Sequence, residues 1–196
     1  IDIAALAEIA EEHGIVLNVD NCFATPVIQR PLELGANIVT HSATKFMDGQ
    51  GRVLGGAILG TEELIAKLRF FIRQTGPALS PFNAWVLSKS LETLSVRMKE
   101  HCVSALELAR RLETDSRVSW VRYPFLESHP QHELARRQME MGGGLVTFEV
   151  RGGAPGGMAF LNALRLVSRS SNLGDTRSIA THPATTTHSR LTEEER

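Results

Sequence analysis

Four polar side chains follow two short apolar runs, and their types suit one chemistry. Asp20 follows the first run, and Ser42, Thr44 and Lys45 follow the second. A carboxylate can keep a pyridine nitrogen protonated, a neutral lysine amine can condense with an aldehyde, and hydroxyls can donate to a phosphate. Pyridoxal phosphate carries all three groups, and its protonated ring is an electron sink. The residue types therefore suit a pyridoxal phosphate site in which Lys45 forms the Schiff base.

Ordinary structural roles account for the same residues. Asp20 could cap a turn, Ser42 and Thr44 could be strand-end hydroxyls, and Lys45 could be a solvated surface charge. An aspartate and a lysine at this spacing occur in many α/β proteins, so spacing alone favours the structural roles. On the residues alone, both interpretations stay open.

The elements that must position these residues follow an α/β pattern. The apolar residues first repeat on one helical face and then form short runs typical of a buried parallel sheet. Because the carboxyl ends of parallel strands share one edge, Asp20 and Lys45 are expected in one crevice. The expected elements are a helix from Ile3 that Gly14 ends, strands over 15–19, 37–40 and 53–60, and a helix over 62–73 capped by Thr61.

The second half predicts a long helix followed by a smaller α+β domain. No proline or glycine interrupts the helical pattern from Pro81 towards Leu112, so this stretch could bridge two domains. Beyond it, the pattern predicts a strand over 118–123, a helix over 131–139, a strand over 144–150, a glycine-rich loop over 152–157 and a helix over 158–166. The expected domains are residues 1–104, with the bridging helix, and residues 105–196.

Composition excludes several classes of partner. The 196 residues carry 21 Lys plus Arg against 22 Asp plus Glu, so no excess charge draws the chain to nucleic acid or an anionic membrane. No apolar run approaches the roughly 20 residues of a membrane-spanning helix, and no signal peptide is expected. The spacing of Cys22 and Cys102 suits neither a disulfide nor a metal site, which indicates a reducing compartment. We therefore expect a cytoplasmic protein with a small-molecule ligand.

Two further patterns point away from metal and dinucleotide sites. His129 with His132, and His182 with His188, match no zinc arrangement, and their His-Pro steps are typical of turns, so no metal site is expected. The glycines over 49–56 do not fit the dinucleotide fingerprint and precede a strand instead of a helix.

Motifs along the whole chain resemble one enzyme family. They are VDNCFATP at 19–26, HSATKF at 41–46, VLGG at 53–56, GPALSPFNA at 76–84, HPQH at 129–132, NLGD at 172–175 and THPATTTH at 181–188. Together they resemble the Cys/Met-metabolism family of pyridoxal-phosphate enzymes, which includes cystathionine γ-synthases, γ-lyases and homoserine-ester sulfhydrylases.

The resemblance implies a fold and a role for each candidate residue. The fold is the α/β fold type I of pyridoxal-phosphate transferases (aspartate-aminotransferase-like), with a mainly parallel sheet in a partial large domain and a smaller α+β C-terminal domain. By resemblance, Asp20 would pair with the pyridinium, Ser42 and Thr44 would bind phosphate, and Lys45 would form the Schiff base and transfer protons. The candidate substrate contacts are Asn172, where many relatives have serine, and Thr187, near Lys45 or the substrate.

Within the family, GQGRVLGG at 49–56 and the segment 79–85 are most similar to the O-succinylhomoserine sulfhydrylase branch. That similarity implies γ-replacement in methionine biosynthesis, in which O-succinyl-L-homoserine and sulfide give L-homocysteine and succinate. The alternatives are a cystathionine γ-synthase or γ-lyase of the same family and, outside enzymes, an inactive fragment or fold relative. A homotetramer built from dimers is also implied.

Some parts of the family's site fall outside these residues. The resemblance implies that the glycine-rich phosphate loop and the stacked aromatic ring precede residue 1, and that the substrate-carboxylate arginine follows Arg196. A tyrosine and an arginine that reach the phosphate from a neighbouring subunit are also outside. We therefore expect a part of a longer chain, inactive when isolated, because it lacks groups that position cofactor and substrate.

Overall fold

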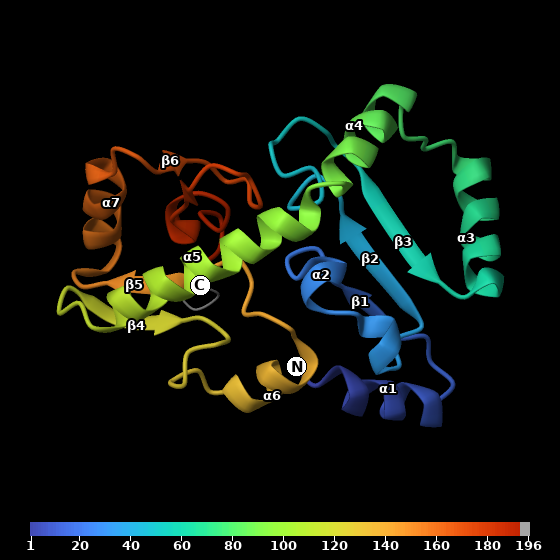
Figure 1. The fold of residues 1–196 in the computed structure, drawn as a ribbon, viewed down its shortest axis with the longest axis horizontal. Coiled ribbons are helices and arrows are strands. Elements are labelled where there is room, and N and C mark those ends of the chain that lie inside the picture. Colours follow the sequence, from blue (N-terminus) through green and yellow to red (C-terminus); the bar gives the residue numbers. More distant parts are fainter. Residues whose placement is uncertain (193–196) are drawn as a thin grey trace.

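The computed structural model describes residues 1–192, and its first half contains a three-stranded sheet in the order β1-β2-β3. β1 (Asn18–Asp20) pairs in parallel with β2 (Ile38–Ser42), and β2 pairs antiparallel with β3 (Gly56–Gly60) (Figure 1). The sheet is therefore mixed, whereas a mainly parallel one was expected for the large domain. The connection over residues 43–55 is built of turns and contains no crossover helix, so the chain returns antiparallel.

The first two strands lie further along the chain than the apolar runs predict. Ile15 donates its amide hydrogen to Ala10 O at 2.8 Å, so it closes the turn that follows the first helix and does not belong to a strand. The third strand starts late because the backbone of Gly55 is engaged by Thr44. These shifts place Asp20 and Ser42 as the last residues of their strands.

Two helices match the sequence prediction because their signals are local. Asp2 accepts from the amide of Ala5 at 3.2 Å and caps α1 (Ile3–Glu12). Thr61 caps α3 (Glu62–Thr75), which ends at Gly76 with φ 87°. The short elements between β1 and β2 were not predicted; they are α2 (Thr25–Ile28) and a 3-10 helix over Pro31–Leu34.

The long helix predicted from Pro81 to Leu112 is two helices in the structure. α4 (Pro81–Leu91) and α5 (Leu94–Glu113) are separated at Glu92 and Thr93. The prediction of one uninterrupted helix was wrong because a turn closed by local backbone and side-chain hydrogen bonds separates the two helices without a proline or glycine. At the break, the Ser90 carbonyl accepts the Thr93 amide at 3.2 Å, the Thr93 hydroxyl at 3.1 Å and an Arg97 side-chain nitrogen at 3.1 Å.

The second half is built around two-stranded pairs. The elements are β4 (Val118–Arg122), antiparallel to β5 (Thr147–Val150); α6 (His132–Gln138); α7 (Gly153–Ala163); β6 (Ser168–Arg169), parallel to β7 (Ile179–Ala180); and a 3-10 helix over Pro183–Thr185. α7 begins inside the glycine-rich segment that was expected to be a loop. Glycine is needed within this helix because a Cβ at Gly156 would lie 2.3 Å from the carbonyl oxygen of Arg151.

α5 lies between the first sheet and the β4-β5 pair, and it contributes to two separate cores (Figure 1). Leu94, Met98 and Cys102 are buried with residues around the Lys45 turn, whereas Ala105 and Ala109 are buried against β4. The predicted division at residues 104 and 105 falls between these two sets. That division stays a prediction, and residues 193–196 of its second part lie outside the described residues.

Candidate active site

The carboxyl edge of β1 and β2 gathers the residues that sequence reasoning singled out. Register pairs Asp20 with Thr40, so Asp20 and the turn beginning at Ser42 lie at the same edge. Asp20 is exposed, and its Oδ1 accepts the amide hydrogen of Cys22 at 3.0 Å. Lys45 is half-buried in the turn that follows β2, where its amide donates to Ser42 O at 3.2 Å.

Lys45 meets a residue from the far end of the chain. Its Nζ donates to Asn172 Oδ1 at 3.0 Å, across a separation of 127 residues. The structure thus brings together the predicted cofactor lysine and a predicted substrate contact. A surface lysine would need no such partner, so this contact favours the functional interpretation of Lys45 over a solvated charge.

The segment 172–176 is packed against the Lys45 turn by its backbone. Thr176 donates its amide hydrogen to Gly49 O at 2.8 Å. Gly174 has φ +83°, and a Cβ there would lie 2.4 Å from the backbone nitrogen of Phe46. Beside it, Asp175 is 5% exposed, and hydrogen bonds from Arg177 hold the pKa of its carboxyl below the usual value. This close approach keeps Asn172 beside Lys45.

The two hydroxyls predicted to bind phosphate differ in their present partners. The Ser42 hydroxyl makes no hydrogen bond to another residue of the described chain. Thr44 Oγ1 accepts the amide hydrogen of Gly55 at 3.1 Å and donates weakly to Gly55 O at 3.4 Å. Ser42 is therefore the freer donor, whereas Thr44 also fixes the start of β3.

Cys22 is a member of the site that sequence reasoning treated only as a free thiol. It is 9% exposed, and its pKa is raised from 9.0 to about 11. Burial contributes most, followed by a hydrogen bond to Asp20 and the negative charge of Asp20, while the positive charge of Lys45 acts in the opposite sense. The position of Cys22 two residues after Asp20 was the feature of the sequence that could have predicted its place in the site.

Thr187 and the histidine pairs lie apart from these contacts. The Thr187 hydroxyl is hydrogen-bonded to Nδ1 of its neighbour His188 at 2.9 Å, so its role at the site stays a prediction. His182 Nδ1 pairs with Thr185 Oγ1 at 2.9 Å, and His129 Nδ1 accepts the amide of Gln131 at 3.1 Å. Among residues 1–192, no three His, Cys, Asp or Glu side chains are grouped as metal ligands.

The donor set at the edge fits pyridoxal phosphate. Asp20 offers an exposed carboxylate, Lys45 an amine and Ser42 a hydroxyl that bonds to no other residue among 1–192. These are the groups that the ring nitrogen, the aldehyde and the phosphate of the cofactor require. The assignment of each role stays a proposal.

Comparison with known proteins identifies the family. A sequence profile described as "Cys/Met metabolism PLP-dependent enzyme" matches residues 1–196. The chain belongs to this family. The expected pyridoxal phosphate cofactor is confirmed with it, since the family is defined by its dependence on that group.

Individual relatives agree with the family assignment. The chain is 54% identical over 196 residues to O-succinylhomoserine sulfhydrylase of Pseudomonas aeruginosa, covering 100% of the chain and 49% of that relative. It is 46% identical over 197 residues to L-methionine gamma-lyase of Pseudomonas putida, covering 100% of the chain and 50% of the relative. The chain thus spans about half the length of the curated relatives it matches.

A solved structure confirms the fold class. Cystathionine gamma synthase from Xanthomonas oryzae pv. oryzae, in complex with aminoacrylate and cysteine, matches with a TM-score of 0.95 at 36% identity. The match covers 100% of this chain and 51% of that one. The chain therefore has the expected α/β fold type I of pyridoxal-phosphate enzymes. Within residues 1–192, no helix has both the length and the apolar character required to cross a membrane.

Proposed function

We propose that the native protein containing this chain uses pyridoxal phosphate to convert O-succinyl-L-homoserine and sulfide into L-homocysteine and succinate. The observation that carries the proposal is the contact between Lys45 and Asn172 at the sheet edge where β1 ends in Asp20. The choice of substrate and nucleophile is supported by the 54% identity to the Pseudomonas aeruginosa relative named O-succinylhomoserine sulfhydrylase.

Three residues of the edge are proposed to bind the cofactor and set its charge. Bound pyridoxal phosphate supplies an electron sink for negative charge at the α carbon of the substrate. Asp20 keeps the ring nitrogen protonated through its exposed carboxylate. Ser42 donates its hydroxyl to the phosphate, and Thr44 can do so by giving up the 3.4 Å bond to Gly55 O.

Lys45 is proposed to bond to the cofactor and then to transfer protons. When its Nζ is not bonded to the cofactor, it would remove the proton from the α carbon of the substrate and move protons at the β carbon. The C–O bond at the γ carbon breaks, succinate leaves with the bonding pair, and sulfide forms a C–S bond there. Asn172, 3.0 Å from Nζ, is proposed to orient the amine and contact the substrate carboxylate, and Thr187 is a further proposed contact.

The same site could serve two related reactions. Cysteine could replace sulfide as the nucleophile, as the Xanthomonas oryzae cystathionine gamma synthase suggests, or the substrate could undergo γ-elimination, as the Pseudomonas putida gamma-lyase suggests. All three share the steps at the α and β carbons, so the described residues bear on them equally. Product analysis separates them.

The native protein should be offered O-succinyl-L-homoserine with equal concentrations of sulfide and cysteine. We expect homocysteine to be the main product, with little cystathionine and little 2-oxobutanoate from elimination. Faster formation of cystathionine would assign the protein to the γ-synthases, and release of 2-oxobutanoate as the main product would assign it to the lyases.

Lys45→Ala tests the cofactor assignment independently of the substrate. We expect the variant to lose the visible absorption band and to lose turnover by roughly 10²- to 10⁴-fold, because both covalent attachment and proton transfer disappear. Borohydride reduction of the parent, followed by peptide mass mapping, should place the cofactor on Lys45. Lys99→Ala, an exposed lysine on α5, is the matched control. Retention of the band in Lys45→Ala would refute the assignment.

The resemblance supports a proposal on assembly, and the spacing of the cysteines supports one on location. We propose a homotetramer built from dimers and a cytoplasmic site of action. Light scattering of the native protein, followed by dilution to detect dimers, tests the first proposal, and fractionation of the source cells tests the second.

A further inference from the structure

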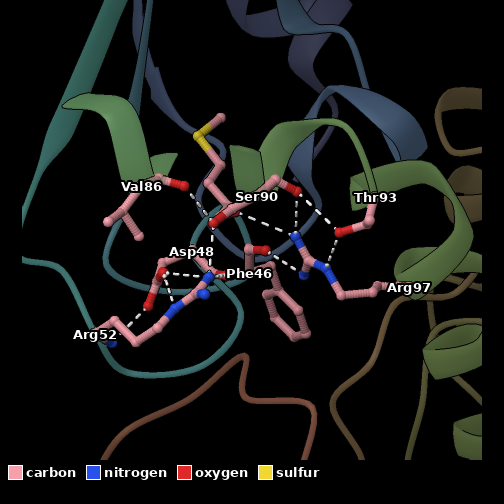
Figure 2. Close-up of polar contacts among 8 residues, drawn as sticks. Phe46, Asp48, Arg52, Val86, Ser90, Thr93 and Arg97 are labelled. Carbon is pink, nitrogen blue, oxygen red and sulfur yellow. Dashed lines mark hydrogen bonds and ion pairs between the residues drawn. The ribbon is translucent and has the colours of Figure 1, made fainter. Parts of the chain in front are cut away.

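The backbone that follows Lys45 is held by an arginine from α5. Arg97 Nη1 donates to the carbonyl of Phe46 at 2.7 Å, and Arg97 Nη2 donates to the carbonyl of Met47 at 3.2 Å (Figure 2). Within the described chain, no backbone amide donates to either carbonyl. The preceding carbonyls of the turn differ, because Lys45 O accepts from Gly49 and Ala43 O accepts from Asp48. Arg97 therefore supplies donors that the turn itself does not.

Arg97 is fixed on its other side by the break between α4 and α5. Its Nε donates to Thr93 Oγ1 at 3.2 Å, and its Nη2 donates to Ser90 O at 3.1 Å (Figure 2). A guanidinium is planar, so four contacts made by three nitrogens leave it little freedom to rotate. Arg97 thereby links the position of the helix break to the positions of the Phe46 and Met47 carbonyls.

A second arginine ties the later part of the turn to the same serine. Asp48 is 1% exposed, and it accepts from the Arg52 amide at 2.6 Å and from Arg52 Nε at 3.1 Å. Arg52 Nη2 also donates to Ser90 Oγ at 2.7 Å. The hydroxyl oxygen of Ser90 thus accepts a hydrogen bond from Arg52, while the Ser90 carbonyl accepts one from Arg97 (Figure 2). Both ends of the segment 46–52 are anchored at one buried residue.

Gly49 leaves the space in which Arg97 lies. A Cβ at this position would lie 2.3 Å from Arg97 Nη1 and 2.7 Å from its Cζ, and φ is +74°. Even the smallest side chain would therefore displace the guanidinium. The turn after Lys45 and the arginine behind it are fitted to one another.

We propose that Arg97 is a positioning residue for Lys45. Arg97 holds the carbonyls of Phe46 and Met47, and it thereby fixes the position of the lysine amine relative to Asp20 and Asn172. The proposal rests on the proposed role of Lys45. Arg97 acts through the backbone and touches neither substrate nor cofactor. Asp48, Arg52 and Ser90 support it from the other end of the turn.

The test compares Arg97→Met and Arg97→Lys with the parent in the native protein loaded with pyridoxal phosphate. Methionine keeps an unbranched apolar side chain but has no hydrogen-bond donors. Lysine keeps the positive charge but lacks the planar, forked donors of the guanidinium. We expect kcat to fall roughly 10- to 100-fold in Arg97→Met with KM changed less than about threefold, because small misplacements of a reacting group cost this much. The pH midpoint of the visible absorption band should shift by about half a unit or more, since it reports the surroundings of the lysine.

Arg97→Lys should lie between the parent and Arg97→Met in both measurements. The matched control is Arg111→Met, which removes an exposed arginine of α5 paired with Glu107 at 2.7 Å and should change neither value. A purely structural role would lower the melting temperature of the Arg97 variants and leave the spectral midpoint and kcat unchanged, which would overturn the proposal. If Arg97→Met does not fold, Arg97→Lys alone decides by the same criterion.

Borohydride reduction and peptide mapping separate the two proposals. Cofactor attached to Lys45 in the parent and in each folded Arg97 variant, with an unmoved midpoint, rejects the positioning role and leaves the proposed function standing. A parent that carries no cofactor on Lys45 rejects the proposed function, and with it the role of Arg97.

Discussion

Cys22 lies under the influence of both charges that the proposed site depends on. Its amide donates to Asp20 at 3.0 Å, and the Asp20 carboxylate raises the thiol pKa, while the Lys45 ammonium lowers it. Burial is the largest cause of the shift to about 11. The thiol can therefore report the electrostatics of the site with no cofactor bound.

Asp20→Asn should lower the pKa of Cys22 from about 11 towards its usual value of 9.0, because the hydrogen bond and the negative charge of Asp20 both raise it. The pH dependence of iodoacetamide alkylation, followed on the Cys22 peptide by mass spectrometry, measures the change. Cys102 is the internal control, since burial raises its pKa and Asp20 does not contribute. An unchanged Cys22 profile would contradict the proximity of thiol and carboxylate.

The segment 172–176 and the Lys45 turn form one packed unit although they are distant in sequence. Their contact is mostly backbone on backbone, through the bond of Thr176 to Gly49 and the approach of Gly174 to Phe46. Only a glycine at position 174 permits this approach. The placement of Asn172 beside Lys45 depends on it.

Gly174→Ala should destabilise the fold by roughly 2–5 kcal/mol, because a strained φ adds to a Cβ 2.4 Å from Phe46 N. Gly76→Ala is a matched control, since Gly76 has φ +87° and open space around the missing Cβ. That variant should cost only about 1 kcal/mol from its backbone. Urea unfolding of both variants measures the difference, and equal losses would show that the packing against Phe46 contributes nothing.

Local signals allowed the sequence to predict several elements correctly. α1 and α3 have periodic apolar faces, capping side chains and glycines at or just beyond their ends, all within a few residues. The common edge of Asp20 and Lys45 was also predictable, because the carboxyl ends of parallel strands share one edge even though each strand ends one or two residues later than expected. The break at Glu92 and Thr93 was not, since no proline or glycine marks it and it is formed by a hydrogen-bonded turn between Ser90 and Thr93.

The candidate site was predicted in the same uneven way. Residues with a conspicuous type at a strand end, such as Lys45, could be found, and the resemblance added Asn172. Arg97 was missed because an arginine in a helical pattern looks like any solvated charge until the backbone it contacts is known. Cys22 was missed because its spacing was compared only with disulfide and metal motifs, and not with its position two residues after Asp20.

Two buried histidines tie the stability of the whole molecule to pH. His41 Nδ1 and His101 Nε2 are buried ring nitrogens with no hydrogen-bond partner among residues 1–192. Burial is the main cause that lowers the pKa of each ring below 6.5, and the charge of Arg97 lowers that of His101 further. Both rings therefore take up a proton less readily in the folded chain than in the unfolded chain.

The free energy of unfolding should be highest above pH 6.5 and should fall as the pH drops below it. The sign follows because each folded-state pKa lies below the unfolded value, so the unfolded chain binds more protons in this window. Urea midpoints between pH 8 and pH 5 test the trend. His41→Asn and His101→Asn should flatten it, whereas His13→Asn, an exposed residue, should not. Parallel trends in all variants would assign the pH dependence to other groups.

The break between α4 and α5 also fixes the rotational phase of the second helix. Each residue of an α-helix advances it by about 100°. One residue inserted between Glu92 and Thr93 would turn Arg97 away from the two carbonyls and at the same time carry Met98 out of the core. Related proteins that contain this site should therefore tolerate a change of residue type at positions 92 and 93 more readily than an insertion or deletion there.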